Sequence, residues 1–336
     1  MPAIIIVFIV VSITIIYLVV FTAPQKQAGL GQFIISPNHT NSSEVADNLI
    51  TKGFVKSSLA FKISYLLHGN HDIQPGSYQV SKSMSAWQIA SILSEEPNMK
   101  WVTIPEGLRK EQIAEIMREK FGWNDEQVNK FVTTYTAMKF DYTEGVYFPD
   151  TYLIPTNESP LDMAERMERH FDEQFTPYVR EAQEQNMQWT TVVKLASIIQ
   201  REAAGSEDMP LIAGILWNRL NQKMKLEVDA TVQYVRDSFA HYGTAPNVYQ
   251  DKNYTAEGTW WKSIQSSDKQ IDSPFNTYLY AGLPPRPISN PGLDAMKSVL
   301  HPESTGCLYY LHDNTRTIHC AKTLAEHEHN IEQYLR

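Results

Sequence analysis

Glu202 is the residue of this sequence that is best placed to do acid–base chemistry. It lies in the stretch LASIIQREAAG (195–205), whose apolar spacing predicts a helix that ends at Gly205. Ile198 and Ile199 share one face of that helix, and Glu202 extends the same face. An apolar surrounding and a helix C-terminus both raise the pKa of a carboxyl group, so Glu202 could keep a proton and act as a general acid. The alternative is a structural glutamate that is paired with an arginine or capped by backbone.

Four further polar residues are weaker candidates for chemistry or substrate binding. Asp229 could be a second carboxylate, but its place before an apolar helical pattern is typical of a helix cap. Asn218 and Arg219 could donate hydrogen bonds to a substrate or could hold the loop that follows them. Asn276 lies in a proline-rich loop, where side chains are often presented to ligands.

Two tryptophans and two histidines leave alternatives of the same kind. Trp260 and Trp261 could stack on sugar rings or could pin a long loop to the body of the protein. His327 and His329, in the sequence EHEH, are two residues apart. On a helix they face different directions and cannot bind one metal ion together. We therefore expect no metal site there, and a terminal helix that faces solvent.

Composition excludes several classes of function. The chain has 336 residues, which suggests two or three domains, and its net charge is −9 without a basic stripe. Nucleic acid is therefore not an expected partner. The sequence has neither a glycine-rich phosphate loop nor a G-x-S-x-G elbow. No cofactor is implied.

Residues 3–23 carry no charge and are long enough to span a bilayer. A cleaved signal peptide is the alternative, but Pro24 follows the segment where cleavage would be disfavoured. We therefore predict a single membrane anchor. Its orientation is poorly marked, because Lys26 follows the segment and no basic residue precedes it.

The rest of the chain alternates between small modules and helical segments. We assign residues 1–24 to the anchor, 25–120 to a small α+β module, 121–190 to a helical connecting region and 191–336 to a mixed α/β catalytic domain. In the α+β module, short helices are predicted near 43–50, 87–94 and 111–118, and strands near 33–36, 76–80 and 101–105. The prolines and aromatics of 144–155 predict a turn packed on a core, and residues 239–268 a long excursion.

The two cysteines, Cys307 and Cys320, flank a predicted hairpin with its turn at Asp313 and Asn314. A two-residue turn would place the cysteines opposite each other, and a longer turn would place them out of register. The sequence therefore leaves a disulfide and two free thiols open.

Residues from about 31 to 336 resemble the YceG-like family of endolytic murein transglycosylases. The resemblance rests on eight motifs in the same order behind one apolar segment. These motifs are VTIPEG (102–107), EGVYFPDTY (144–152), LASIIQREA (195–203), NRL (218–220), DATVQY (229–234), DSPFNTY (272–278), GLPPRPISNPG (282–292) and KTLAEH (322–327).

The resemblance implies a bacterial, membrane-anchored enzyme of the cytoplasmic membrane, whose LysM-like module and catalytic domain lie outside the cytoplasm. Glu202 would be the catalytic acid and base. Its substrate would be nascent peptidoglycan strands, cut internally near the peptidoglycan synthases. The resemblance also points to substrate contacts in the matching motifs: Gln200, Asn218, Arg219, Asp229, Thr231, Tyr234, Asn276, Thr277 and Tyr278.

The chain departs from the family pattern at three places. Many members have a second acid where this sequence has Gln200, so Glu202 is the only acid of the motif. Ile318 and Cys320 fill the places of a common His-x-Phe pattern, and the excursion 239–268 replaces a shorter connection.

One acid is enough for a lytic transglycosylase, because the muramyl 6-hydroxyl of the substrate is the nucleophile and a 1,6-anhydro end results. Two other functions remain open. A muramidase would add water with Asp229 as second carboxylate, and a tethered glycan-binding protein would not cut at all.

Overall fold

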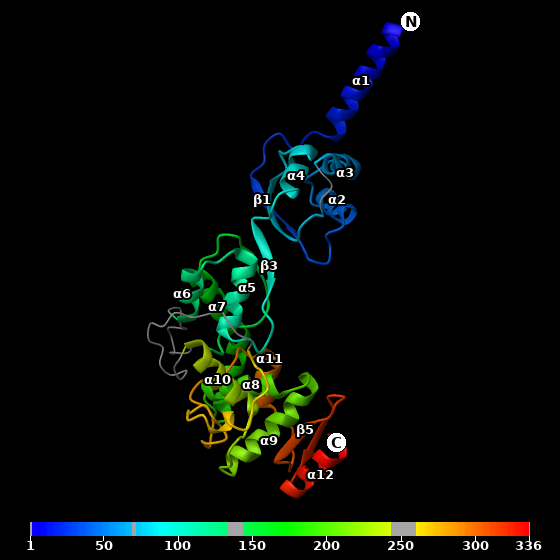
Figure 1. Cartoon of the computed structure of the whole chain (residues 1–336). Helices are drawn as coiled ribbons and strands as arrows, with labels where there is room; N and C mark the ends of the chain where they lie inside the picture. Colours follow the sequence, from blue (N-terminus) through cyan, green and yellow to red (C-terminus); the bar gives the residue numbers. More distant parts are fainter. Residues whose placement is uncertain (1, 69–71, 134–143, 243–259, 336) are drawn as a thin grey trace. The chain divides into compact units, whose positions relative to one another are not determined.

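The computed structural model describes residues 2–68, 72–133, 144–242 and 260–335, and it combines α and β structure in two compact units (Figure 1). Unit 1 comprises residues 1–103 and 151–158, and unit 2 comprises residues 104–150 and 159–336. The division at residue 103 differs from the predicted boundaries at 120 and 190. Residues 104–120 and most of the predicted connecting region thus share a unit with the predicted catalytic domain.

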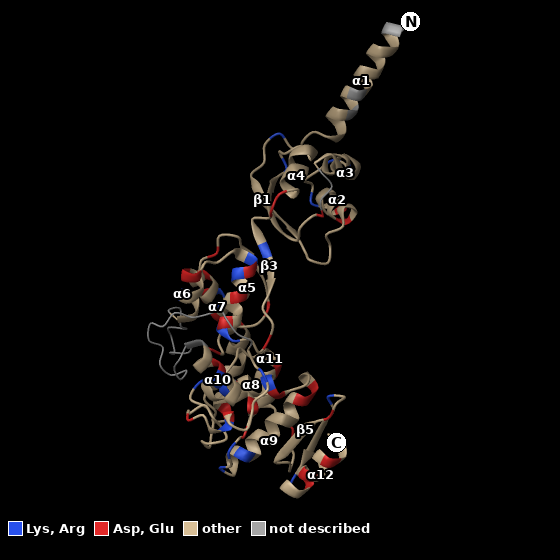
Figure 2. Ribbon diagram, viewed as in Figure 1, with Lys and Arg blue, Asp and Glu red and all other residues tan. Residues whose placement is uncertain are grey.

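Helix α1 (Pro2–Val20) begins the chain and carries no charged residue (Figure 2). Among the described residues, no helix combines the length and the apolar character that a membrane crossing requires. The anchor over residues 1–24 therefore stays a prediction from the sequence.

Unit 1 is built on an antiparallel sheet in the order β1–β2–β3–β4. Its elements are β1 (Leu30–Ile35), α2 (Ser42–Thr51), α3 (Ser58–Leu67), β2 (Gly76–Ser81), α4 (Ala86–Leu93), β3 (Met99–Thr103) and β4 (Thr151–Pro155). Phe33 and Val80 of the sheet pack with Leu49, Phe61 and Ile89 of the helices in one core. The α+β character predicted for this part of the chain is confirmed.

Two elements of unit 1 were not expected from the sequence. Helix α3 has apolar residues around nearly all of its circumference, so it shows little of the one-sided pattern that marks a surface helix. Strand β4 lies within the segment predicted as a turn, and it pairs with β3 from Met99–Pro155 to Thr103–Thr151. A strand that joins a sheet from almost fifty residues away leaves no local signal of its partner.

Unit 2 is mainly helical and ends in a hairpin followed by a helix. Its elements are α5 (Lys110–Phe121), α6 (Asp125–Thr133), α7 (Pro160–Glu184), α8 (Trp189–Glu202), the 3-10 turn η1 (Ser206–Asp208), α9 (Met209–Asn221), α10 (Asp229–Tyr242), η2 (Asp268–Gln270), α11 (Leu293–Leu300), β5 (Tyr309–His312), β6 (Ile318–Ala321) and α12 (Leu324–Tyr334). Helix α8 is central to this unit, because Leu195, Ile198 and Ile199 are fully buried and α7, α9, α10 and α11 contact it.

The predicted end of the central helix at Gly205 is wrong. Helix α8 ends at Glu202, and Ala203 is already extended, with φ −70° and ψ 141°. The chain turns there into η1, because α9 begins at Met209 and packs back against α8. Glu202 is therefore the last helical residue of α8.

Candidate active site

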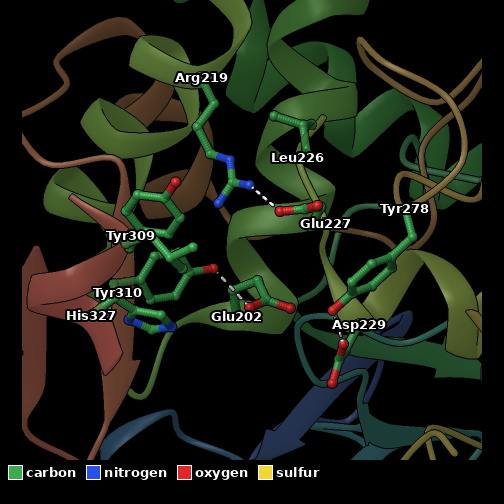
Figure 3. Close-up of a pocket in the computed structure, with 10 residues that line it drawn as sticks. Glu202, Arg219, Leu226, Glu227, Asp229, Tyr278, Tyr309, Tyr310 and His327 are labelled. Atoms are coloured by element: carbon green, nitrogen blue, oxygen red, sulfur yellow. Dashed lines mark hydrogen bonds and ion pairs between the residues drawn. The ribbon is translucent and has the colours of Figure 1, made fainter. Parts of the chain in front are cut away.

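A pocket of about 400 Å³ in unit 2 contains Glu202 (Figure 3). Its lining comes from the end of α8, from α9 and the loop after it, from the start of α10, from the loop at Tyr278, and from β5 and α12. The lining residues are Glu202, Arg219, Leu226, Glu227, Asp229, Tyr278, Tyr309, Tyr310, Leu324 and His327. Segments more than a hundred residues apart in the chain thus meet around one carboxyl group.

The Glu202 carboxyl group is partly buried and receives two hydrogen bonds. The Tyr310 hydroxyl donates to Glu202 Oε2 at 2.7 Å, and the backbone N–H of Ala230 donates to the same carboxyl group. Ala230 lies in the first turn of α10, so the carboxyl group sits at the positive end of that helix dipole. Its own helix presents the opposite end, since α8 finishes at Glu202.

The net effect of these surroundings is to raise the pKa of Glu202 above that of an ordinary glutamate. Burial is the largest cause, and the nearby negative charge of Asp229 adds to it. The hydrogen bonds from Tyr310 and Ala230 and the nearby His312 act in the opposite direction, because each stabilises the ionised carboxylate. A raised pKa favours the protonated form that a general acid needs.

Asp229 is the second carboxylate of the pocket, and its surroundings differ from those of Glu202. It is exposed at the start of α10 and accepts a hydrogen bond of 2.5 Å from the Tyr278 hydroxyl. Burial and this contact with Asp229 raise the pKa of Tyr278, so the phenol keeps its proton. Two acids in different surroundings, one desolvated and one near solvent, suit different roles.

Arg219 lines the pocket, but its guanidinium nitrogens donate hydrogen bonds to other groups of the protein. Its Nε donates to the Lys225 carbonyl at 2.9 Å, Nη1 to the Leu308 carbonyl at 3.2 Å, and Nη2 to the Glu227 carboxylate. Of the two roles left open by the sequence, the structure shows that Arg219 holds the loop after α9. It also ties that loop to the start of the hairpin.

Gln200 and Asn218 lie outside the pocket lining. Gln200 Oε1 accepts from the Gly292 N–H at 3.0 Å, and its side chain also bonds Glu106. Asn218 Nδ2 donates to the carbonyls of Thr305 and Cys307 at 2.8 and 3.1 Å. Both side chains therefore connect segments of unit 2 instead of facing the pocket.

Four other predicted substrate residues are buried and do not line the pocket. Thr231 and Thr277 share a hydrogen bond of 2.9 Å, and Thr277 also accepts from the Val228 N–H. Asn276 donates to two carbonyls of its own loop. Tyr234 is 1 % exposed and packs on Phe275. These residues shape the loop that carries Tyr278 and the turn that carries Asp229.

Three aromatic residues of the C-terminal segment were missed by the sequence reasoning. Tyr309 and Tyr310 come from β5, and His327 comes from α12 and stacks on Tyr309 with a centroid distance of 5.5 Å. Helix α12 is mostly exposed, as predicted, but His327 is half-buried and lines the pocket. In the sequence, the signal that could have indicated His327 was the family motif KTLAEH, which ends at this residue. Among the described residues, no group of three or more His, Cys, Asp or Glu could hold a metal ion.

The hairpin that carries the two tyrosines is closed by a disulfide between Cys307 and Cys320. Its turn spans residues 313–317, the longer of the two alternatives left open by the sequence, and Asp313 accepts hydrogen bonds there from the N–H groups of Thr315 and Thr317. Tyr310, and not Cys307, therefore lies opposite Cys320 in the ladder.

The two tryptophans pin their segment instead of facing the pocket. Trp261 lies over the Arg201 guanidinium group, 4.2 Å from ring centroid to Cζ, and its Nε1 donates to Gln112. Trp260 lies over Arg109 at 4.3 Å. Residues 243–259 of the predicted excursion lie outside the described residues, and residues 239–242 belong to α10.

A sequence profile of the YceG-like family matches residues 34–333. The chain belongs to the YceG-like family. Its YceG-like fold also resembles the crystal structure of a putative YceG-like protein from Listeria monocytogenes, with a TM-score of 0.57 and 25 % identity. That match covers 90 % of this chain and 99 % of the Listeria chain.

Two bacterial relatives of this YceG-like chain are named endolytic murein transglycosylase. The Bacillus subtilis protein is 27 % identical over 321 residues, covering 89 % of this chain and 83 % of its own length. The Streptococcus pneumoniae D39 protein is 26 % identical over 334 residues. That match also covers 89 % of this chain, but the chain spans only 57 % of the pneumococcal protein.

Proposed function

We propose that this protein is a lytic transglycosylase that cleaves the glycan strands of peptidoglycan, with Glu202 as its acid and base. The observation that carries the proposal is the protonation-favouring environment of Glu202 at the centre of a pocket. Family membership and the names of the relatives support the same reaction. The muramyl residue of the substrate carries the nucleophile, its 6-hydroxyl group, so the reaction needs no second catalytic carboxylate.

Glu202 serves both halves of the reaction. Its carboxyl group donates the proton to the glycosidic oxygen between N-acetylmuramic acid and N-acetylglucosamine, and the C1–O bond breaks. The muramyl 6-hydroxyl oxygen bonds to C1, and the Glu202 carboxylate accepts the hydroxyl proton. The products are a 1,6-anhydromuramyl end and a free N-acetylglucosamine 4-hydroxyl. No water is consumed, and the carboxyl group ends protonated as it began.

The neighbours of Glu202 fit this two-way proton transfer. The Tyr310 hydroxyl and the Ala230 N–H stabilise the carboxylate that exists between the two transfers. Burial and Asp229 favour the return of the proton. Some neighbours favour the protonated form of Glu202 and others favour its carboxylate. The group is therefore suited to donate a proton in one step and to accept one in the next.

A hydrolytic muramidase is the second candidate, because Asp229 lines the same pocket as Glu202. In that reaction Asp229 would activate water or bond to the sugar. The Asp229 carboxylate already accepts a hydrogen bond from the Tyr278 hydroxyl at 2.5 Å, so one of its oxygens is engaged and less available to water or to the sugar. This contact favours the transglycosylase over the muramidase.

Product masses separate these functions directly. Purified protein is incubated with peptidoglycan, and the new ends are identified by mass spectrometry. The transglycosylase produces anhydromuramyl ends, which are one water lighter than the reducing ends of a muramidase. The Glu202→Gln variant should produce neither. Reducing ends as the main product would refute the proposal, and glycan binding without new ends would support a non-catalytic role.

We further propose that the protein acts inside nascent strands at the outer face of the cytoplasmic membrane, near the peptidoglycan synthases. The uncharged segment 3–23 supports membrane attachment. The small α+β part of unit 1 supports a LysM-like glycan-binding role for this region. The sizes of early products would test internal cutting: long fragments indicate it, and single disaccharides contradict it.

A further inference from the structure

Helix α3 of unit 1 leaves an apolar face exposed. Leu59, Ile63, Leu66 and Leu67 lie on one side of the helix and are 65 %, 40 %, 60 % and 66 % exposed. The opposite side packs into the core of the unit through Phe61. Contiguous exposed apolar side chains of this kind mark a contact site on a folded unit.

The exposed surface continues onto α4 and reaches the end of α1. Trp87, which is 47 % exposed, lies against His68 at the C-terminal cap of α3, with a centroid distance of 4.2 Å and the ring planes tilted by 48°. The residue before it, Ala86, donates its N–H to the Phe21 carbonyl just after α1. The apolar face therefore begins where the uncharged helix α1 ends, and the side chains of α1 are themselves largely exposed.

Lysines lie at the junction between α1 and the rest of unit 1. Lys56 Nζ donates to Thr22 Oγ1 at 2.8 Å, and Lys26 lies in the segment that follows α1. Ammonium groups and a tryptophan at the border of an apolar surface are typical of the headgroup level of a bilayer.

We propose that Leu59, Ile63, Leu66, Leu67 and Trp87 form a lipid-contact face that lies against the headgroup and outer acyl region of a bilayer. The occupant is lipid and not a second copy of the chain. Two copies that met through this face would bring the lysines of both chains together, whereas anionic headgroups neutralise them. The proposal does not depend on the reaction at Glu202, nor on α1 crossing the bilayer.

A spin-label measurement on the full-length chain tests the lipid-contact face. Because Cys307 and Cys320 are bonded to each other, a cysteine introduced by Leu66→Cys or Leu59→Cys can be labelled selectively with a nitroxide. The matched control is Glu95→Cys, on an exposed residue past the other end of α4 from Trp87. The labelled proteins are reconstituted with vesicles of phosphatidylethanolamine and phosphatidylglycerol.

Oxygen, which concentrates in lipid, and a water-soluble nickel chelate then compete to relax the label. We expect the oxygen-to-nickel ratio at Leu66 and Leu59 to be several-fold higher than at Glu95. Equal ratios at the three sites would overturn the proposal, as would a protein that does not float with the vesicles. Shielding of Leu66 from both reagents, with or without spin–spin broadening between copies, would show a protein partner and would also overturn it.

Discussion

At the scale of single residues, the proposed reaction depends on the balance between neighbours that raise the pKa of Glu202 and neighbours that lower it. Burial and Asp229 favour the acid, and Tyr310, Ala230 and His312 favour the carboxylate. A group used once as an acid and once as a base benefits from both influences. Substituting one of these neighbours at a time should therefore change the reaction rate or shift the pH–rate profile in the direction given by its effect on Glu202.

Glu202→Gln should abolish most of the activity without unfolding the protein. The amide has nearly the same size, but it can neither donate the proton to the leaving oxygen nor accept one from the 6-hydroxyl. Loss of general acid–base help costs a factor of about 10²–10⁴ in rate, and one residue supplies both transfers here. The matched control, Asp229→Asn, should cost much less. The rate of anhydro-end formation and the thermal unfolding midpoint measure both effects, and a Glu202→Gln rate within a few-fold of wild type would remove Glu202 as the catalyst.

Tyr310→Phe should shift the alkaline limb of the pH–rate profile upward. The Tyr310 hydroxyl stabilises the ionised Glu202, so its removal raises the pKa of Glu202 further. The acid then keeps its proton to higher pH, and kcat/KM falls at a higher pH than in the wild type. Tyr280→Phe is the matched control, because its hydroxyl bonds Asp272 outside the pocket lining. An unchanged or downward-shifted limb in Tyr310→Phe would contradict this account.

At the scale of elements, the pocket depends on the placement of the hairpin β5–β6 and of α10 around the end of α8. Asn218 and Arg219 of α9 hold the start of the hairpin through the carbonyls of Thr305, Cys307 and Leu308. Thr277 fixes the turn before α10. Several family motif residues thus act on the site indirectly, by positioning the elements that carry the pocket side chains.

The disulfide of the hairpin should contribute measurably to stability. Cys307 and Cys320 are 13 residues apart, and closing a loop of this length lowers the entropy of the unfolded chain. Replacing both by serine should reduce the free energy of unfolding by about 2–4 kcal/mol. Denaturant titration measures this change, with reduction of the wild-type protein as a second route to the same state. Two alkylatable thiols in the unreduced, unfolded wild type would show that the bond does not form.

A buried acid at the start of α5 should make stability depend on pH. Glu144 accepts a hydrogen bond from the Lys110 N–H, and burial together with the nearby Glu111 raises its pKa to about 8. Between the ordinary glutamate range and pH 8, the folded state keeps a proton that the unfolded state has released. Stability therefore falls as pH rises through this window.

Glu144→Gln should remove that part of the pH dependence, because the amide does not titrate and its oxygen can still accept from the Lys110 N–H. We expect the variant to gain stability relative to the wild type as the pH is raised from about 5 to 8. Thermal unfolding at several pH values measures the difference. A stability difference that stays constant or moves the other way would show that Glu144 is ionised in the folded protein.

At the scale of the whole molecule, α1 and the following residues make different contributions. Most described side chains of α1 are exposed, whereas Val20 and Phe21 pack against the core of unit 1. Removing residues 2–19 should therefore leave the thermal unfolding and the glycan cleavage of the purified protein nearly unchanged. Removing residues 2–24 should lower the unfolding midpoint, because the Phe21 carbonyl and Thr22 hydroxyl contacts are also lost. Equal midpoints for the two deletions would contradict this division.

The sequence by itself determined Glu202 as the candidate acid, most of the helices and the membership of a family. These depend on local information, since helical periodicity places Glu202 on an apolar face and motif order is preserved along the chain. The end of α8 was misplaced by three residues, because packing of the next helix and not local propensity decides where α8 stops.

Only the tertiary structure decided which residues share the pocket. Tyr310 and His327 meet Glu202 from more than a hundred residues away, and no local pattern encodes that distance. Asn276 and Thr231 carry family motifs yet are buried as supports, because polar groups in a loop core must satisfy one another. The residue types in the sequence indicate the chemistry, whereas the tertiary structure decides which residues line the pocket and which support the elements around it.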